Sequence, residues 1–333
     1  MSGAESAAAI SAAPTTMRAA VLAEPGMTRI DAVPRPEPGA GEVRIQLQGC
    51  GVCGSNLPVW EGQPWFQYPL EPGAPGHEGW GVVDAIGPAV DTVQPGDRVA
   101  VMSQRAFAEY DVAPAEACVR LPPALAERPF PGEPLGCAVN VFRRSEIGRG
   151  DTVVVIGIGF IGAVVARLAS RAGATVIAVS RRPFALEIAR AQGADIALPL
   201  DDYERVVGEV EHLTGGTGAD RVIEAIGLQG PLDLAARLTR IRGRLVIAGY
   251  HQDGPRQVDM QLWNWRGLDV INAHERDATV VRDGVRAAVE LVAEGVLDTG
   301  PLFTHRVELA RLGDALELVR ARPDGFLKAL VVP

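Results

Sequence analysis

The sequence predicts an α/β protein of two domains, a mostly antiparallel β domain followed by a doubly wound parallel sheet. The 333 residues exceed what one hydrophobic core usually accommodates. To about residue 125 the chain is rich in Gly and Pro and contains short β-branched runs, which is typical of short strands joined by turns. From Asp151 onward, apolar strands alternate with amphipathic helical segments, and this alternation indicates a parallel sheet with helices on both faces.

Each element follows from its local pattern. The first sixteen residues, rich in Ala and Ser, predict a flexible leader, and Met17 begins the first strand. The expected strands of the β domain include 17–23, 42–47, 81–86 and 97–101. Those of the parallel sheet are 152–156, 175–179, 221–225 and 244–248, alternating with helices over 162–171, 183–192 and 231–240. A helix over 279–294, a second helix ending near Arg322 and a strand over 328–332 complete the chain.

Composition and charge exclude several classes of function. Hydrophobic residues make up 47% and charged residues 22% of the chain, a globular balance. The net charge of -9 repels nucleic acid and anionic bilayers, so no nucleic-acid partner is expected. The longest apolar run, 152–166, contains three glycines and is shorter than the ~18 residues of a membrane span. Four cysteines in a chain of this length predict thiols or ligands in the reducing cytoplasm.

A glycine motif indicates a dinucleotide site. An apolar strand runs directly into G-I-G-F-I-G, and an Ala-rich helix follows, which is the context that this motif requires. Gly157 allows the tight turn, Gly159 lets the backbone approach a pyrophosphate, and Gly162 lets helix and strand pack closely. The helix N-terminus then faces the phosphates. The cofactor-binding residues predicted here are Gly157, Gly159, Phe160, Ile161 and Gly162.

The end of the next strand favours NADP over NAD. NAD-binding proteins commonly place an acidic residue there for the ribose hydroxyls, but this chain has Ser180, Arg181 and Arg182. Two guanidiniums can bind a 2′-phosphate in bidentate fashion. The alternative is that both arginines are solvated at the start of a helix.

Two loops of the β domain carry metal-binding side chains. Cys53 follows one expected strand, and His77 with Glu78 opens another. A thiolate, an imidazole and a carboxylate suit zinc, and three protein ligands leave a fourth position for substrate. The chain at this point resembles the medium-chain, zinc-type alcohol and polyol dehydrogenases. The motifs that carry the resemblance are Gly76-His77-Glu78 with Gly81, Gly87 and Val90, then Gly96-Asp97-Arg98-Val99, Ala108-Glu109-Tyr110, Glu133-Pro134-Leu135 and the glycine motif.

The resemblance implies a GroES-like catalytic domain over 17–138, a Rossmann domain over 139–271 and a return to the catalytic domain over 272–333. It implies a cytoplasmic homodimer or homotetramer that transfers a hydride between a secondary alcohol or ketone and NADP(H) or NAD(H). The polyol branch suggests a sugar alcohol or cyclitol, and a plain secondary alcohol remains open. The alternatives are a zinc-free quinone or enoyl reductase of the same superfamily and a non-catalytic NADPH-binding protein.

The resemblance also assigns the zinc ligands. It implies that Cys53 and His77 are ligands of the catalytic zinc. Glu133 is favoured over Cys137 as the third ligand, because the E-P-L register of the sorbitol branch places Cys137 beside the nicotinamide. Ser55 is expected to relay the substrate proton, and Glu78 is expected to act beside the metal, as an occasional ligand or as a route for the proton.

Further residues of this family pattern concern the cofactor and the cleft. Ile226 and Gly227 are expected beside the cofactor riboses, and Lys328 at the pyrophosphate. The stretch between Val99 and Ala106 lacks the four cysteines of a structural zinc lobe, so one zinc per chain is expected. Aromatic residues are candidates either for the substrate cleft or for the core: Trp60, Trp65, Phe66, Tyr68 and Phe107.

Two further departures affect the metal and the proton. Asn56 replaces an acidic partner of the ligand histidine, and Pro58 replaces a relay histidine. A weaker hold on the metal is therefore expected at His77.

Overall fold

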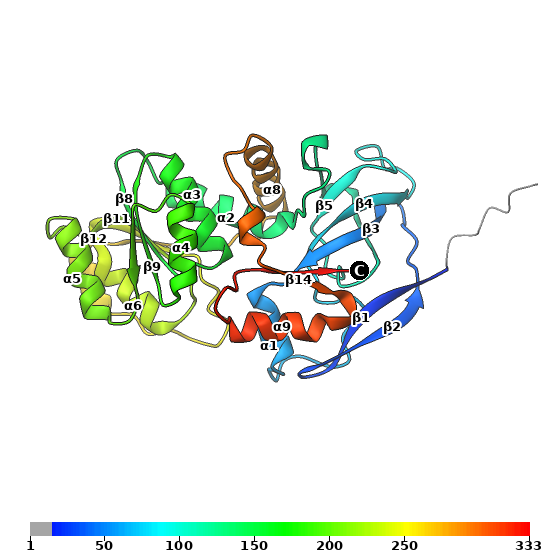
Figure 1. Cartoon of the computed structure of the whole chain (residues 1–333), viewed down its shortest axis with the longest axis horizontal. Coiled ribbons are helices and arrows are strands. Elements are labelled where there is room, and N and C mark those ends of the chain that lie inside the picture. Colours follow the sequence, from blue (N-terminus) through cyan, green and yellow to red (C-terminus); the bar gives the residue numbers. More distant parts are fainter. Residues whose placement is uncertain (1–14) are drawn as a thin grey trace, which may run out of the picture.

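The computed structural model describes residues 15–333, so the predicted leader over 1–16 lies almost entirely outside the described residues. Figure 1 shows two lobes, a β-rich lobe built from both ends of the chain and a lobe in which helices cover a parallel sheet. This arrangement confirms the predicted fold class. Within residues 15–333, no helix is long and apolar enough to cross a membrane.

The β-rich lobe contains a hairpin and a seven-stranded sheet. The hairpin joins β1 (Thr16–Glu24) to β2 (Met27–Pro34). The sheet has the order β14-β15-β3-β4-β5-β7, and β6 pairs with β3 beside this path. Its strands are β3 (Glu42–Gly51), β4 (Glu78–Ile86), β5 (Arg98–Val101), β6 (Tyr110–Pro114), β7 (Cys118–Arg120), β14 (His305–Glu308) and β15 (Ala329–Val332). The last two strands therefore return the end of the chain to the first lobe.

The second lobe has six parallel strands in the order β10-β9-β8-β11-β12-β13, the arrangement of a dinucleotide-binding sheet. The strands are β8 (Thr152–Ile156), β9 (Thr175–Ser180), β10 (Ile196–Pro199), β11 (Ala219–Glu224), β12 (Thr239–Ile247) and β13 (Asp269–Asn272). The intervening helices are α3 (Phe160–Arg171), α4 (Pro183–Ala191), α5 (Tyr203–Leu213), α6 (Gln229–Leu238) and α7 (Met260–Arg266).

Two longer helices, α2 (Gly132–Ser145) and α8 (Ala278–Ala293), pack against each other between the lobes, and α1 (Leu57–Trp60) and α9 (Leu312–Ala321) belong to the β-rich lobe. Gly136 allows the close approach of α2 and α8, because a Cβ there would lie 2.7 Å from Val285. Several predicted boundaries are wrong. The helix expected over 231–240 ends at Leu238, and β12 starts directly at Thr239 instead of at 244. Strand β4 starts at Glu78 instead of at 81. No element was predicted for the stretches that hold α2, α5, α7, β10 and β13, among others.

Candidate metal and nucleotide site

The loop after β3 is fixed by a buried amide. Asn56, 1% exposed, accepts a hydrogen bond at Oδ1 from the Cys53 backbone nitrogen (3.1 Å). Its Nδ2 donates to the Pro75 carbonyl on the neighbouring loop (3.2 Å). One side chain therefore satisfies a backbone group on each of the two loops and holds Cys53 beside the segment that carries His77.

His77 is oriented by a backbone carbonyl. Its Nδ1 lies 2.9 Å from the Pro75 carbonyl oxygen, and because a carbonyl only accepts, this geometry puts the ring proton on Nδ1. Nε2 is then the ring nitrogen that can ligate a metal, and it lies 3.5 Å from the Ser55 hydroxyl. Burial alone would lower the pKa of His77. The hydrogen bond to Cys53 and the charges of Cys53, Glu78 and Glu133 raise it to about 10.

Glu78 lies opposite a residue without a side chain. It is the first residue of β4 and pairs across the sheet with Gly51 of β3. A Cβ at Gly51 would lie 1.9 Å from Glu78 Oε2, so glycine at this position leaves the space that the carboxylate fills. Glu78 is fully buried.

A buried ion pair holds Glu78 from the other end of the chain. Lys328 Nζ donates to Glu78 Oε1 (2.6 Å). The second oxygen, Oε2, lies 2.5 Å from the same nitrogen but receives no directed hydrogen bond. Burial alone would lower the pKa of Lys328, and the charges of Glu78, Cys53 and Glu133 raise it. One buried carboxylate oxygen of Glu78 is thus left with unused capacity as an acceptor.

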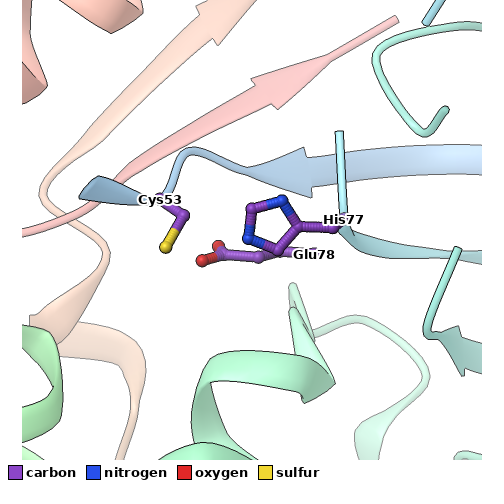
Figure 2. A group of neighbouring side chains, drawn as sticks. All are labelled: Cys53, His77 and Glu78. Atoms are coloured by element: carbon purple, nitrogen blue, oxygen red, sulfur yellow. The ribbon is translucent and has the colours of Figure 1, made fainter. Parts of the chain in front are cut away.

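These side chains converge on one point. Figure 2 shows the Cys53 thiol, the His77 ring and the Glu78 carboxylate directed toward one another, and one potential ligand atom from each lies within 4.8 Å of the others. The set combines a soft thiol, an imidazole and a carboxylate, and Glu78 Oε2 is the incompletely satisfied atom. This donor chemistry fits a zinc ion with an open fourth position.

The carboxylate in this group is Glu78, whereas the sequence motif favoured Glu133. Glu133 lies in the first turn of α2 and accepts a hydrogen bond from Cys137 Sγ (3.1 Å), one helical turn further along. Burial raises the pKa of Glu133, and the negative charge of Glu78 raises it further. The Glu133 carboxylate therefore faces the same cluster of charges, and its role as a ligand stays a prediction, as does the place of Cys137 at the nicotinamide.

The glycine motif forms a tight turn between β8 and α3. Gly157 has φ +97°, a backbone conformation that favours glycine. A Cβ at Gly162 would lie 2.1 Å from the Gly157 carbonyl oxygen, so this glycine permits the tight packing of turn and helix. A Cβ at Gly159 would meet nothing within 4 Å. Because no side chain caps α3 at Gly159, its first N–H groups are open to an anion.

The last residue of β9 and the two residues after it divide into two groups. Ser180 is buried, and its Oγ accepts a hydrogen bond from the Arg182 backbone nitrogen (3.3 Å). The Arg182 guanidinium donates to the carbonyls of Ile158 (3.2 Å) and Phe326. Arg181 is exposed and has no hydrogen-bond partner among the described residues. Arg182 thus joins the glycine motif to the C-terminal segment, and Arg181 stays free to bind a ligand.

A buried network that sequence reasoning missed positions Ile226 and Gly227. Their backbone nitrogens donate to Oε1 of Glu224 (2.7 and 2.8 Å), which is fully buried at the end of β11. His251 Nε2 lies 3.0 Å from Glu224 Oε2, and Arg256 Nε donates to His251 Nδ1 (2.8 Å). An acidic residue that ends an apolar strand was the available signal for this network.

Lys328 contacts the glycine motif as well as Glu78 of the candidate metal site. Its Nζ lies 5.3 Å from the centre of the Phe160 ring, a cation–π distance. The predicted contact of Lys328 with a pyrophosphate remains a prediction, since the ammonium is also paired with Glu78. Of the aromatic candidates for the cleft, Trp60 and Phe107 belong to the buried core of the β-rich lobe.

The comparisons with known proteins match parts of both lobes. The family model for the alcohol dehydrogenase GroES-like domain matches residues 39–123, and the model for zinc-binding dehydrogenase matches residues 161–294. The sorbitol dehydrogenase of Bacillus subtilis (strain 168) is 25% identical over 96% of this chain and 98% of its own length.

Two solved structures share the whole fold. A putative zinc-binding dehydrogenase from Sinorhizobium meliloti 1021, bound to NADP, is 27% identical with a TM-score of 0.83 and covers 96% of this chain and all of its own. A short chain alcohol dehydrogenase from Escherichia coli CFT073, complexed with NADH, is 25% identical with a TM-score of 0.85 over the same shares. This chain belongs to the zinc-type alcohol and polyol dehydrogenases of the medium-chain dehydrogenase superfamily and is an NAD(P)-linked alcohol dehydrogenase of that type.

Proposed function

We propose that the protein oxidises a secondary alcohol, or reduces the matching ketone, with one zinc ion and NADP. The observation that carries this proposal is the convergence of Cys53, His77 and Glu78, with ligand atoms within 4.8 Å of one another, beside the Ser55 hydroxyl. The three side chains would hold the zinc and leave a position for substrate. Glu133, which faces the same charges from α2, would border that position.

Zinc would lower the pKa of the substrate hydroxyl when bound, and NADP would accept the hydride. The chain's own residues manage the proton and the geometry. Ser55 Oγ, held 3.5 Å from His77 Nε2, would accept the hydroxyl proton and pass it toward solvent. Asn56 fixes the Cys53 loop, and Glu224 fixes the loop with Ile226 and Gly227 that would flank the nicotinamide ribose.

The substrate class that we favour is a polyol or cyclitol. The support is the similarity to a sorbitol dehydrogenase over 96% of this chain. A plain secondary alcohol is the alternative, and it would need no further hydrogen-bonding groups in the cleft.

NADP is favoured over NAD because the end of β9 offers positive charge and no carboxylate. Ser180 and Arg181 stand where a ribose-binding acid would repel a 2′-phosphate. Arg182 contributes its charge, although its N–H groups are engaged with the Ile158 and Phe326 carbonyls. The related structures contain NADP in one case and NADH in the other, so this preference rests on the residues of this chain.

We also propose a homo-oligomer in the cytoplasm. Apolar side chains are exposed on α7 and just before it. They are Val258, Met260 and Trp265, and Trp265 is 84% exposed. The neighbouring strand β13 is an edge of the parallel sheet. Exposed apolar side chains beside a sheet edge are typical of a protein interface. The four cysteines are free thiols, as suits a reducing compartment.

The proposed function is tested by elemental analysis together with a panel of secondary alcohols and polyols, followed at the nicotinamide absorbance. We expect close to one zinc per chain and NADP-linked oxidation of a polyol, and chelation should abolish the activity. Full activity without metal would favour a zinc-free reductase, and NADPH binding without turnover of any alcohol or ketone would favour a non-catalytic NADPH-binding protein.

A further inference from the structure

His251 lies between a buried carboxylate and a guanidinium at the carboxyl end of the parallel sheet. It belongs to the segment after β12, and its side chain is 15% exposed. Its Nε2 lies 3.0 Å from Oε2 of Glu224, the fully buried last residue of β11. On the other side of the ring, Arg256 Nε donates to His251 Nδ1 (2.8 Å), and Asp253 pairs with the same guanidinium. The imidazole therefore bridges two groups of opposite charge.

These two partners fix the tautomer of the ring. A guanidinium has donors and no acceptor, so the His251 Nδ1 that receives the Arg256 hydrogen bond carries no proton. The ring proton is then on Nε2, where it is donated to the Glu224 carboxylate. A second proton would have to enter at Nδ1, where it would face the Arg256 Nε–H group and end that hydrogen bond. The bridge therefore needs a neutral imidazole.

The bridge holds two loops whose backbones touch. Glu224 Oε1 accepts a hydrogen bond from the Gly227 nitrogen (2.8 Å) in the loop after β11. A terminal guanidinium nitrogen of Arg256 donates to the Gly227 carbonyl (2.9 Å) in the same loop. A Cβ at Gly227 would lie 2.7 Å from the Tyr250 carbonyl oxygen, so this loop packs directly on the segment that carries His251.

The loop after β11 also contacts the glycine motif. A Cβ at Gly157 would lie 2.4 Å from Ile226 Cγ1, so the Ile226 side chain packs against the tight turn of the motif. A change in the position of this loop is therefore transmitted to the backbone that surrounds the candidate nucleotide site.

We propose that His251 is a positioning residue for the nicotinamide cofactor, and that its neutral imidazole holds the loop with Ile226 and Gly227 in the form that binds the cofactor. This inference rests on the proposed function, which puts that loop beside the cofactor ribose, and deepens it by making cofactor binding depend on one proton. Protonation of the ring ends the hydrogen bond from Arg256 and loosens the hold of this guanidinium on the Gly227 carbonyl. Binding of NADP and NAD then weakens alike, because these contacts do not involve the 2′-phosphate.

The first test measures binding of NADP and NAD to the full-length protein by titration calorimetry at fixed salt. In His251→Gln, the new amide can donate to Glu224 and accept from Arg256, but it takes up no proton. We expect this variant to bind both cofactors within about twofold of wild type at about pH 8. His251→Leu leaves both charged partners unmatched and should bind both about tenfold more weakly. It should raise the Michaelis constant for the cofactor more than it changes kcat.

The pH dependence of binding separates a positioning role from a merely structural one. From about pH 8 to about pH 5, where an imidazole can gain a proton, the affinity of wild type for NAD should fall more than that of His251→Gln. NAD is the probe because the 2′-phosphate of NADP titrates in the same range. Other titrating groups, His274 beside Tyr250 among them, are the same in both proteins. The matched control is His212→Gln, at an exposed position near the end of α5, and it should follow wild type.

Two outcomes would overturn the inference. One is an equal pH dependence for wild type and His251→Gln, a comparison that needs no destabilised variant. The other is a His251→Gln variant that binds as weakly as His251→Leu, or a His251→Leu variant that binds as tightly as wild type. Failure of wild type to bind either NADP or NAD would instead overturn the proposed function, so the two failures are distinguishable.

Discussion

Replacing Gly51 with alanine tests how the metal site is built. The added Cβ would lie 1.9 Å from Glu78 Oε2 and 3.1 Å from both Glu78 Cδ and Lys328 Cε. Non-bonded carbon and oxygen atoms do not approach this closely, so the carboxylate must move by more than an ångström. It is fully buried and bonded to Lys328, so it cannot move into solvent without breaking that pair.

Two effects of this substitution have different magnitudes. Overpacking a buried site costs about 1–3 kcal/mol of folding free energy. Displacing a group that ligates or orients a metal typically costs about tenfold to a hundredfold in metal affinity. The expected outcome is therefore a folded protein of lower melting temperature that loses zinc on dialysis against a chelator at concentrations that leave wild type loaded.

The assay compares zinc content after graded chelation in wild type, Gly51→Ala and Gly54→Ala. Gly54 lies three residues further along the same segment, but its added Cβ would make only an ordinary contact of 3.9 Å with Arg322. Gly54→Ala should keep its zinc. If Gly51→Ala retains zinc as firmly as wild type, the carboxylate of Glu78 is not part of the metal site.

Three further predictions address the ligand, the cofactor and the assembly. Glu78→Gln should lose zinc at lower chelator concentration than Glu133→Gln, as measured by elemental analysis, and the opposite order would make Glu133 the third ligand. Arg181→Gln should raise the Michaelis constant for NADP about tenfold and change that for NAD by less than twofold at fixed salt, whereas an equal rise for both would remove Arg181 from 2′-phosphate recognition. Trp265→Glu should shift the light-scattering mass toward that of the monomer, while Met27→Glu, at another exposed apolar position, should leave it unchanged; an unaltered mass in both would place the interface elsewhere.

Patterns confined to one segment of sequence predicted the fold well. The apolar run before the glycine motif becomes β8, and the strands that flank it pair in parallel as the alternation with helices requires. The error at Leu238 has its cause outside the segment. Thr239 and Arg240 continue the polar and apolar spacing of α6, but pairing of Thr239 with Ala219 of β11 draws the chain into β12. Strand pairing prevailed over helical periodicity there.

The metal loops show where sequence reasoning stops. The sequence motifs placed Cys53 and His77 on neighbouring loops, and in the structure their side chains converge with that of Glu78. That these residues bind zinc stays a prediction. Which carboxylate lies nearest to Cys53 and His77 depends on the register between β3 and β4. Only the pairing of Gly51 with Glu78 leaves room for the Glu78 side chain. The register depends on both strands, so neither segment of sequence predicts it alone.

The same reasoning explains why contacts between the lobes escaped prediction. Lys328 meets Glu78 across 250 positions of sequence, and Arg182 bonds the Phe326 carbonyl across 144. Nothing near Lys328 in the sequence distinguishes an ammonium that binds a pyrophosphate from one that pairs with a buried acid. The structure shows that the ammonium is near both the Phe160 ring of the glycine motif and Glu78 of the metal cluster. The buried ammonium of Lys328 therefore links the nucleotide lobe to the candidate metal site. A change in the charge of either site alters the electrostatic potential at the other.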